Sequence, residues 1–321
     1  MNRPAPQLEH SFPFDPTYGY DLEQLLAVQA PETPSDFADF WRQTFAEASL
    51  MPLNLSSREV DCPVAGYRLF HVQYDSLGAV RIGAWVTVPT SGEFHGGTVV
   101  GHGYGGREAP NYDLPLPPGP AIFFCARGFH RSAHRTIPNE AMRHVRHGIE
   151  SRETYVLRGC AADIWASASA LIQMFPEAGQ NLRYFGGSFG GGLGALALPW
   201  DNRFRKAFLD VPTFGNHPLR LTMQCVGSGE SVRLYHARHP EVARVLPYFD
   251  TAIAAKFIQI PVCVAAALFD PAVVPPGQYC VYNSLGGSKE LYIRTAAHFS
   301  GPREAEENAE LNDHLTRFFH D

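Results

Sequence analysis

The sequence alternates short apolar runs with helical patterns, and this alternation limits the fold more than any other feature. Several of the runs end in glycine or aspartate, which is typical of buried strands in a parallel sheet. The runs are "YRLFHVQYD", "VRIGAWVTVPT", "GGTVVGHG", "AIFFCARG", "LRYFGG", "KAFLDVP", "IPVCVAAALFD" and "KELYIRTAAH". Strands and helices in this order predict an α/β fold with a doubly wound, mostly parallel sheet.

Two segments interrupt the alternation. Residues 1–60 are interpreted as an N-terminal extension, in which "TPSDFADFWRQTFAEA" predicts a helix capped by Thr33 with Pro34 in its first turn. Residues 214–256 predict a helical insertion after the sixth strand. We expect both to belong to one domain, 1–321. Ligands bind beyond the carboxyl ends of the strands in such sheets, so we expect the insertion to lie near the site.

Composition narrows the class of protein. The 321 residues carry a net charge of −6. Proteins that bind nucleic acid usually carry a basic patch or stripe, so nothing here favours nucleic-acid binding. No apolar stretch is long enough to cross a membrane, and the N-terminus lacks the apolar core of a signal peptide. We therefore expect a soluble cytoplasmic protein. Its six cysteines are widely spaced and are interpreted as free thiols. The even count also permits one or two disulfides as an alternative.

The stretch "RYFGGSFGGGLGALALPW" contains G-x-S-x-G centred on Ser188. A strand pattern precedes it and a helix pattern follows it, which is the context in which this motif holds up a nucleophilic serine. Glycine at 186 and 190 would relieve the crowding of a sharp turn. The alternative is a glycine-rich corner without chemistry. The context favours the nucleophile.

A serine nucleophile needs a base, and in this arrangement the partners follow in the order Ser, acid, His. The next strand run with an acid at its end gives Asp270, and the run after it gives His298. Asp210 is the competing acid. We prefer Asp270 because it directly precedes the strand and helix that lead to His298. Asp250 lies in the insertion and is interpreted as a solvated surface residue.

Two main-chain N–H groups should hold the oxyanion of such a reaction. Phe189 follows the serine at the head of the helix, where the helix dipole adds to its N–H. "TVVGHGYGG" is a histidine–glycine loop after an earlier strand, and Tyr104 is its candidate donor.

Two further patterns do not predict a cofactor or a metal. Gly101, Gly103 and Gly106 spell G-x-G-x-x-G, but a proline-rich loop follows where a dinucleotide fold needs a helix. The histidines of residues 130–147 have helical spacings, but no carboxylate or cysteine joins them in a recognised ligand pattern. We interpret that segment as a polar loop and expect no cofactor and no metal.

The chain resembles the acetyl xylan esterase and cephalosporin C deacetylase family, carbohydrate esterase family 7. The resemblance spans nearly the whole length and is carried by "SDFADFW", "HGYGG", "GGSFGGGLGALAL", "DNRFRKAFLDVP", "FDPAVVPPGQYCVYNSLGG" and the late "HF". It implies an α/β-hydrolase fold with the triad Ser188, Asp270 and His298 and the oxyanion donors Tyr104 and Phe189. It also implies deacetylation of small acetylated sugars, and often a ring-shaped hexamer.

The chain departs from the family pattern at three positions. Phe189 stands where the family usually has glutamine after the nucleophile, Phe129 replaces the glutamine of an Arg-Gly-Gln motif, and Phe299 replaces the glutamate after the histidine. The first change leaves the backbone donor in place. The other two remove polar side chains.

The sequence thus predicts a serine esterase that acts on short acyl esters, with acetylated carbohydrates as expected substrates. We expect Gly103, Phe129 and Pro212 to line the substrate pocket. A thioesterase, a dienelactone-type hydrolase, a serine peptidase and a non-catalytic protein on a hydrolase fold remain alternatives, because function lies in the pocket and not in the fold.

Overall fold

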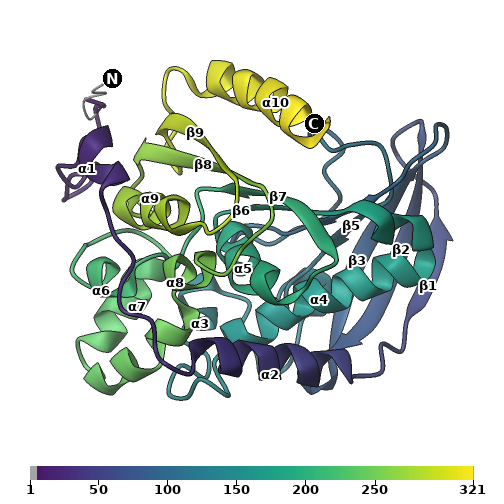
Figure 1. Ribbon diagram of the computed structural model, residues 1–321, viewed down its shortest axis with the longest axis horizontal. Helices are drawn as coiled ribbons and strands as arrows, with labels where there is room; N and C mark the ends of the chain where they lie inside the picture. The colour runs from purple at the N-terminus through teal and green to yellow at the C-terminus, as the bar shows by residue number, and fades with distance from the viewer. Residues whose placement is uncertain (1–5, 321) are drawn as a thin grey trace.

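The computed structural model describes residues 6–320 of the chain, so the first five residues of the expected N-terminal extension and residue 321 lie outside it. Nine strands within this range form one sheet in the order β1-β2-β3-β5-β4-β6-β7-β8-β9 (Figure 1). The strands are β1 (Ser56–Val60), β2 (Tyr67–Ser76), β3 (Val80–Pro89), β4 (Gly97–Val100), β5 (Ala121–Phe124), β6 (Leu182–Gly187), β7 (Phe204–Asp210), β8 (Val262–Phe269) and β9 (Lys289–Ala296).

The sheet is antiparallel from β1 to β5 and parallel from β5 to β9, which confirms the predicted α/β class. Strand β4 lies between β5 and β6, so the strand that follows β4 in the chain lies on one side of it and the next strand lies on the other. At such a switch point the loops that follow neighbouring strands separate and leave a crevice for a ligand. The loop after β4 and the turn after β6 meet there.

Helices and one loop cover the two faces of the sheet. The α-helices are α1 (Leu22–Leu26), α2 (Phe37–Ser49), α3 (Ala141–His144), α4 (Val156–Met174), α5 (Phe189–Ala197), α6 (His217–Arg220), α7 (Ser228–His236), α8 (Thr251–Ala255), α9 (Pro275–Ser284) and α10 (Glu304–His320). Helices α2, α4, α5, α8 and α9 build the large core on one face (Figure 1). On the other face, α10 packs over β7 and β8, and the proline-rich loop 106–120 packs beside it. None of the helices in residues 6–320 has the length and apolarity to cross a bilayer.

The N-terminal region differs from its prediction in two ways. Residues 56–60 form an edge strand, β1, which carries mostly exposed side chains and so shows no apolar pattern. Helix α2 begins at Phe37 and not at Pro34, so Thr33 does not cap it. The side chain of Asp36 does not cap the helix either, because its carboxylate accepts hydrogen bonds from Arg152 and Tyr248. Distant partners therefore decide where this helix begins.

The helical insertion is present, but it follows the seventh strand because β1 shifts the count. It comprises α6, α7, α8 and the short 3₁₀ helices Pro240–Arg244 and Leu246–Phe249. Asp250 is fully buried in it, which corrects the interpretation of that residue as a surface group. Its carboxylate accepts N–H groups from Asn216, His217 and Ala252. Burial raises its pKa to about 6, against the opposing effect of these hydrogen bonds.

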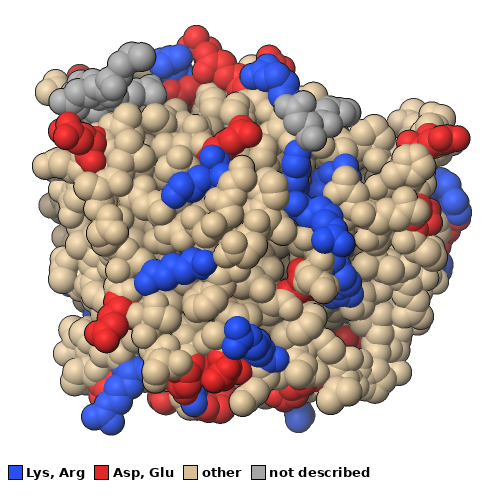
Figure 2. All heavy atoms as spheres, in the orientation of Figure 1, with Lys and Arg blue, Asp and Glu red and all other residues tan. Residues whose placement is uncertain are grey.

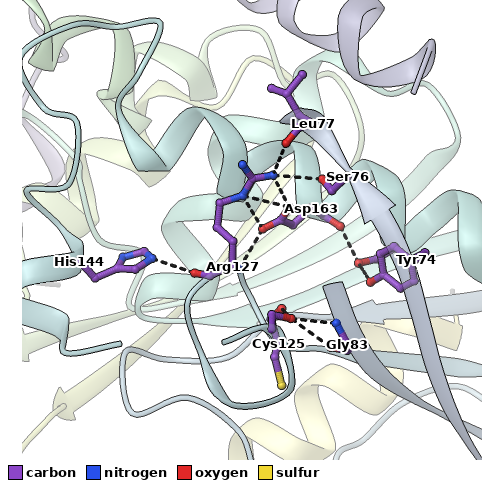
Figure 3. A network of polar contacts seen from close by, with 10 residues as sticks. Tyr74, Ser76, Leu77, Gly83, Cys125, Arg127, His144 and Asp163 are labelled. Atoms are coloured by element: carbon purple, nitrogen blue, oxygen red, sulfur yellow. Dashed lines mark hydrogen bonds and ion pairs between the residues drawn. The ribbon is translucent and has the colours of Figure 1, made fainter. Parts of the chain in front are cut away.

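A buried ion pair ties the end of β5 to helix α4 (Figure 3). The Arg127 guanidinium, which is 9% exposed, donates to the fully buried carboxylate of Asp163 at 2.7 Å. The same guanidinium donates to Ser76 Oγ and Leu77 O at the turn between β2 and β3. Burial disfavours the charge of Arg127, but Asp163 outweighs it and raises the arginine pKa. This network fixes the segment that leads into the loop 127–129.

We predict that Arg127→Met lowers the free energy of unfolding by about 3–5 kcal/mol, because it leaves the Asp163 carboxylate buried without its counter-charge. Urea denaturation followed by circular dichroism measures the change. Arg42→Met is the matched control, because Arg42 and its partner Asp39 are 64% and 69% exposed, and we expect little effect from its loss. Equal effects of the two substitutions would contradict the prediction.

Candidate active site

The serine of G-x-S-x-G stands on a strained turn between β6 and α5. Ser188 has φ 52° and ψ −112°, a backbone conformation that residues other than glycine rarely adopt. Its N–H donates to the carbonyl of Asp210 on the neighbouring strand at 2.8 Å. A Cβ on Gly190 would lie 2.9 Å from the backbone N of His102, so only glycine allows α5 to approach the loop after β4 this closely. The glycine pattern follows from this close packing.

Ser188, His298 and Asp270 form one chain of hydrogen bonds. Ser188 Oγ lies 3.0 Å from His298 Nε2, and His298 Nδ1 lies 2.8 Å from Asp270 Oδ2. Asp270 follows β8 and His298 follows the end of β9, so the carboxyl ends of parallel strands bring together residues up to 110 positions apart. An ionised carboxylate only accepts hydrogen bonds, so in the neutral imidazole Nδ1–H donates to Asp270 and Nε2 accepts the Ser188 hydroxyl.

Asp270 is fully buried, and four donors hold its carboxylate. Oδ1 accepts the N–H groups of Ala272 and Val273 at 2.8 and 2.9 Å. Oδ2 accepts Gln278 Nε2 at 2.8 Å in addition to His298. The Gln278 side chain is itself fixed, because it donates to Val273 O and accepts the N–H of Ala267. Sequence reasoning missed Gln278, and its position in the first turns of the helix after Asp270 was the available signal.

The competing acid has another partner. Asp210 lies at the end of β7 and pairs with Arg294 of β9, whose Nε is 2.9 Å from Asp210 Oδ1. It therefore does not accept from His298. The preferred acid, Asp270, is the one that the structure places against the imidazole.

The two expected oxyanion donors lie side by side. Phe189 is the first residue of α5, so its N–H has no acceptor within the helix. Tyr104 lies in the loop after β4, and its ring stacks on the ring of Phe189 with centroids 4.0 Å apart and planes at 18°. This stacking fixes the two residues relative to each other.

Phe129 belongs to the same aromatic cluster. Its ring lies 6.1 Å from Phe189, 6.0 Å from Tyr104 and 4.7 Å from His144, and it is 2% exposed. The two positions where the resembling family usually has glutamine, 129 and 189, thus hold phenylalanine rings in one cluster. Burial lowers the pKa of His144 to about 4, so the cluster contains a neutral imidazole at neutral pH.

A cavity of about 290 Å³ opens at Ser188. Its lining residues come from the serine turn, the ends of β7 and β9 and the start of α10: Gly103, Gly187, Ser188, Asp210, Val211, Arg294, Ala296, Ala297, His298, Phe299, Glu304, Glu307 and Asn308. Of the expected pocket residues, Gly103 is in this set. Phe129 and Pro212 are not, because both are buried in the packing beneath the loops.

The glycine, histidine and cysteine patterns of the sequence form no cofactor or metal site in the part of the chain that the structure describes. A loop, not a helix, follows Gly106. His144 is buried and lies 3.0 Å from Arg127 O, which corrects the interpretation of residues 130–147 as polar loop throughout. Within residues 6–320, no group of three or more His, Cys, Asp or Glu side chains is arranged to hold a metal ion. The six cysteines all lie in this range and are free thiols, as interpreted from their spacing.

The model of the acetyl xylan esterase (AXE1) family matches residues 19–314. The chain belongs to this family. The computed structure is similar to the acetyl xylan esterase from Paenibacillus sp. R4, with a TM-score of 0.78 and 24% identity over 91% of this chain and 99% of that one. Acetyl xylan esterase 1 from Thermoanaerobacterium sp. JW/SL YS485 gives a TM-score of 0.75 and 18% identity over 90% and 96% of the two chains.

An acylaminoacyl peptidase from Pyrococcus horikoshii is also similar, with a TM-score of 0.59 and 14% identity over 80% of this chain and 42% of that one. These structural likenesses confirm the α/β-hydrolase fold. Membership of the acetyl xylan esterase family supports an acetyl esterase, that is, a carboxylic ester hydrolase.

We predict that the pKa of His298 lies above its ordinary value and falls when Asp270 is replaced by Asn. Burial lowers the pKa of the imidazole, but the charge and hydrogen bond of Asp270 outweigh it. Without the charge of Asp270, the lowering effect of burial on the pKa of His298 is no longer outweighed. Titration of the imidazole by NMR measures both values. Asp201→Asn, at a buried carboxylate paired with Arg203, is the control that should leave His298 unchanged. An unchanged or raised pKa in Asp270→Asn would refute the prediction.

Proposed function

We propose that the protein is a serine esterase that hydrolyses short acyl esters, acetyl esters above all, of small carbohydrates such as xylo-oligosaccharides. The observation that carries the proposal is the unbroken hydrogen-bond chain from Ser188 through His298 to Asp270, at the mouth of a cavity, in a chain of the acetyl xylan esterase family. The cavity of about 290 Å³ lies at the small end of the range for ligand sites, which favours a small substrate.

In the first half of the proposed reaction, the hydroxyl proton of Ser188 moves to His298 Nε2 as Oγ bonds to the acyl carbon. The carbonyl electron pair moves onto the oxygen, and the N–H groups of Tyr104 and Phe189 donate to the oxyanion. Asp270 stabilises the imidazolium and fixes its orientation. The carbonyl then re-forms, the bond to the alcohol oxygen breaks, and His298 gives that oxygen the proton. The products are the free alcohol and acyl-Ser188.

In the second half, water takes the place of the alcohol. His298 accepts a proton from the water as its oxygen bonds to the acyl carbon. The ester bond to Ser188 then breaks, and His298 returns the proton to Oγ. The acid leaves and the enzyme is restored. The transfers between Ser188 and His298 cross the 3.0 Å that separate Oγ from Nε2 in the free protein.

We further propose that the protein works in the cytoplasm. All six of its cysteines are free, and five of them are buried. Free thiols persist in the reducing cytosol, whereas oxidising compartments favour disulfides.

We expect Ser188→Ala to lower the rate of acetyl ester hydrolysis by about 10⁴–10⁶-fold, because the substitution removes the nucleophile while leaving the fold intact. The rate is measured with p-nitrophenyl acetate and with acetylated xylose. A fluorophosphonate probe should label the wild type and not the variant. Ser49→Ala, at the end of helix α2, is the control that should retain both the rate and the labelling.

A substrate panel separates the proposal from its rivals. p-Nitrophenyl esters of increasing chain length are compared with acetylated xylose, a thioester and a peptide. Cleavage of only the long acyl esters, the thioester or the peptide would refute the acetyl-esterase proposal. A wild type that the probe does not label would favour a non-catalytic protein.

We also predict that kcat/KM for p-nitrophenyl acetate rises with pH through a midpoint above the ordinary histidine value of about 6.5. The reaction needs the neutral imidazole as base, and protonation below its pKa removes that base. Because the pKa of His298 is raised, the loss of activity on acidification begins at higher pH than for an unperturbed histidine. A midpoint at or below the ordinary value would count against His298 as the base.

A further inference from the structure

The cavity at Ser188 has one strongly polar wall. Asp210 at the end of β7, Arg294 near the end of β9 and Asn308 in the first turns of α10 line it together. Charged side chains of both signs gather over α10, which covers this part of the sheet (Figure 2). The family match assigns no role to these three residues, and the reaction described above does not use their side chains.

The three side chains form one connected unit. Arg294 Nε and Nη2 donate to the two carboxylate oxygens of Asp210 at 2.9 and 3.2 Å. Arg294 Nη1 donates to Asn308 Oδ1 at 2.9 Å. Arg294 and Asp210 are only 12% and 26% exposed, so the ion pair is sheltered and holds its geometry. The unit therefore presents preoriented polar groups to the cavity.

The unit adjoins the reacting groups. The carbonyl of Asp210 accepts the N–H of Ser188 at 2.8 Å, and Asp210 lies opposite Gly187 in the pairing of β7 with β6. Phe299, the residue after His298, lines the same cavity. In the proposed reaction the leaving alcohol receives its proton from His298, which also lines this cavity, so we place the alcohol oxygen at the cavity.

The hydrogen bonds within the unit leave capacity for a ligand. Guanidinium has five donors, of which three are used, and each carboxylate oxygen of Asp210 has a further lone pair. The amide nitrogen of Asn308 adds two donors. Planar groups that both donate and accept suit adjacent hydroxyl groups, and the ring of Phe299 offers an apolar surface for the C–H face of a sugar.

We propose that Asp210, Arg294 and Asn308 form the subsite for the leaving alcohol and determine specificity by binding its hydroxyl groups. The alcohol is then a sugar or a similar polyol. This inference rests on the proposed function, because it assigns the alcohol side of the same reaction.

The test compares two acetates that share a six-membered ether ring. Methyl 3-O-acetyl-β-xylopyranoside carries free hydroxyl groups on both carbons next to the ester, and tetrahydropyran-4-yl acetate, with its ester at the same ring position, carries none. The measured quantity is the ratio of kcat/KM for the sugar acetate to kcat/KM for the plain ring acetate, from initial rates. We expect a ratio well above one for the wild type, and Asn308→Ala should lower it by roughly 3- to 10-fold, as for the loss of one or two neutral hydrogen bonds.

Asn312→Ala is the matched control, because Asn312 lies one turn further along α10 and does not line the cavity. It should leave the ratio at the wild-type value. Asp210→Asn is a second variant, which keeps the shape of the side chain and should also lower the ratio. Thermal melting checks that each variant is folded. General damage to catalysis lowers both rate constants and leaves the ratio unchanged, so the ratio reports alcohol recognition alone.

The outcomes separate the two proposals. A lowered ratio in Asn308→Ala and Asp210→Asn, but not in Asn312→Ala, supports the subsite. A wild-type ratio near one, or an unchanged ratio in both cavity variants, overturns the subsite and leaves the esterase proposal standing. If the wild type hydrolyses neither acetate, the proposed function fails and the subsite fails with it.

Discussion

The close contact between the start of α5 and the loop after β4 is the constraint on which the site depends. Gly190 meets the backbone of Gly101 and His102 at distances that no side chain would allow. This contact holds Ser188 in its strained conformation and brings the two expected oxyanion donors, Tyr104 and Phe189, together. In the proposed reaction, a serine fixed in this way needs little rearrangement when substrate binds, and such preorganisation is the main source of electrostatic stabilisation in acyl transfer.

Three fully buried aspartates show how one residue type is put to different uses by its partners. Asp163 faces a guanidinium and anchors β5 to α4. Asp250 accepts backbone N–H groups and organises the start of α8. Asp270 accepts two backbone N–H groups and Gln278, and is left with one direction for His298. A buried carboxylate without partners is very costly, so each of the three has several hydrogen-bond donors. Asp270 differs from the other two because one of its donors is the imidazole of His298.

The two sides of Ser188, the proposed nucleophile, differ in character. At the loop after β4, Tyr104, Phe129 and Phe189 form an aromatic cluster. On the α10 side, Asp210 and Arg294 form a charged wall. The resembling family usually has glutamine at positions 129 and 189. Phenylalanine at both positions suits this aromatic cluster, because a buried glutamine amide would need hydrogen-bond partners there and a phenylalanine ring needs none.

The sequence by itself determined eight of the nine strands along the chain, the turn that carries Ser188, and the positions of Asp270 and His298 just after strand ends. Each depends on local pattern together with one general rule, that parallel strands end at a common edge. Only the tertiary structure decided which groups pair across long separations. It buried Asp250, gave Asp210 to Arg294, added Gln278 behind Asp270 and enclosed Phe129 and Pro212. It also revealed β1, whose exposed residues form a strand only because β2 supplies the hydrogen bonds. Local sequence carries the periodicity of an element, but the partner of a side chain depends on packing, which no single segment encodes.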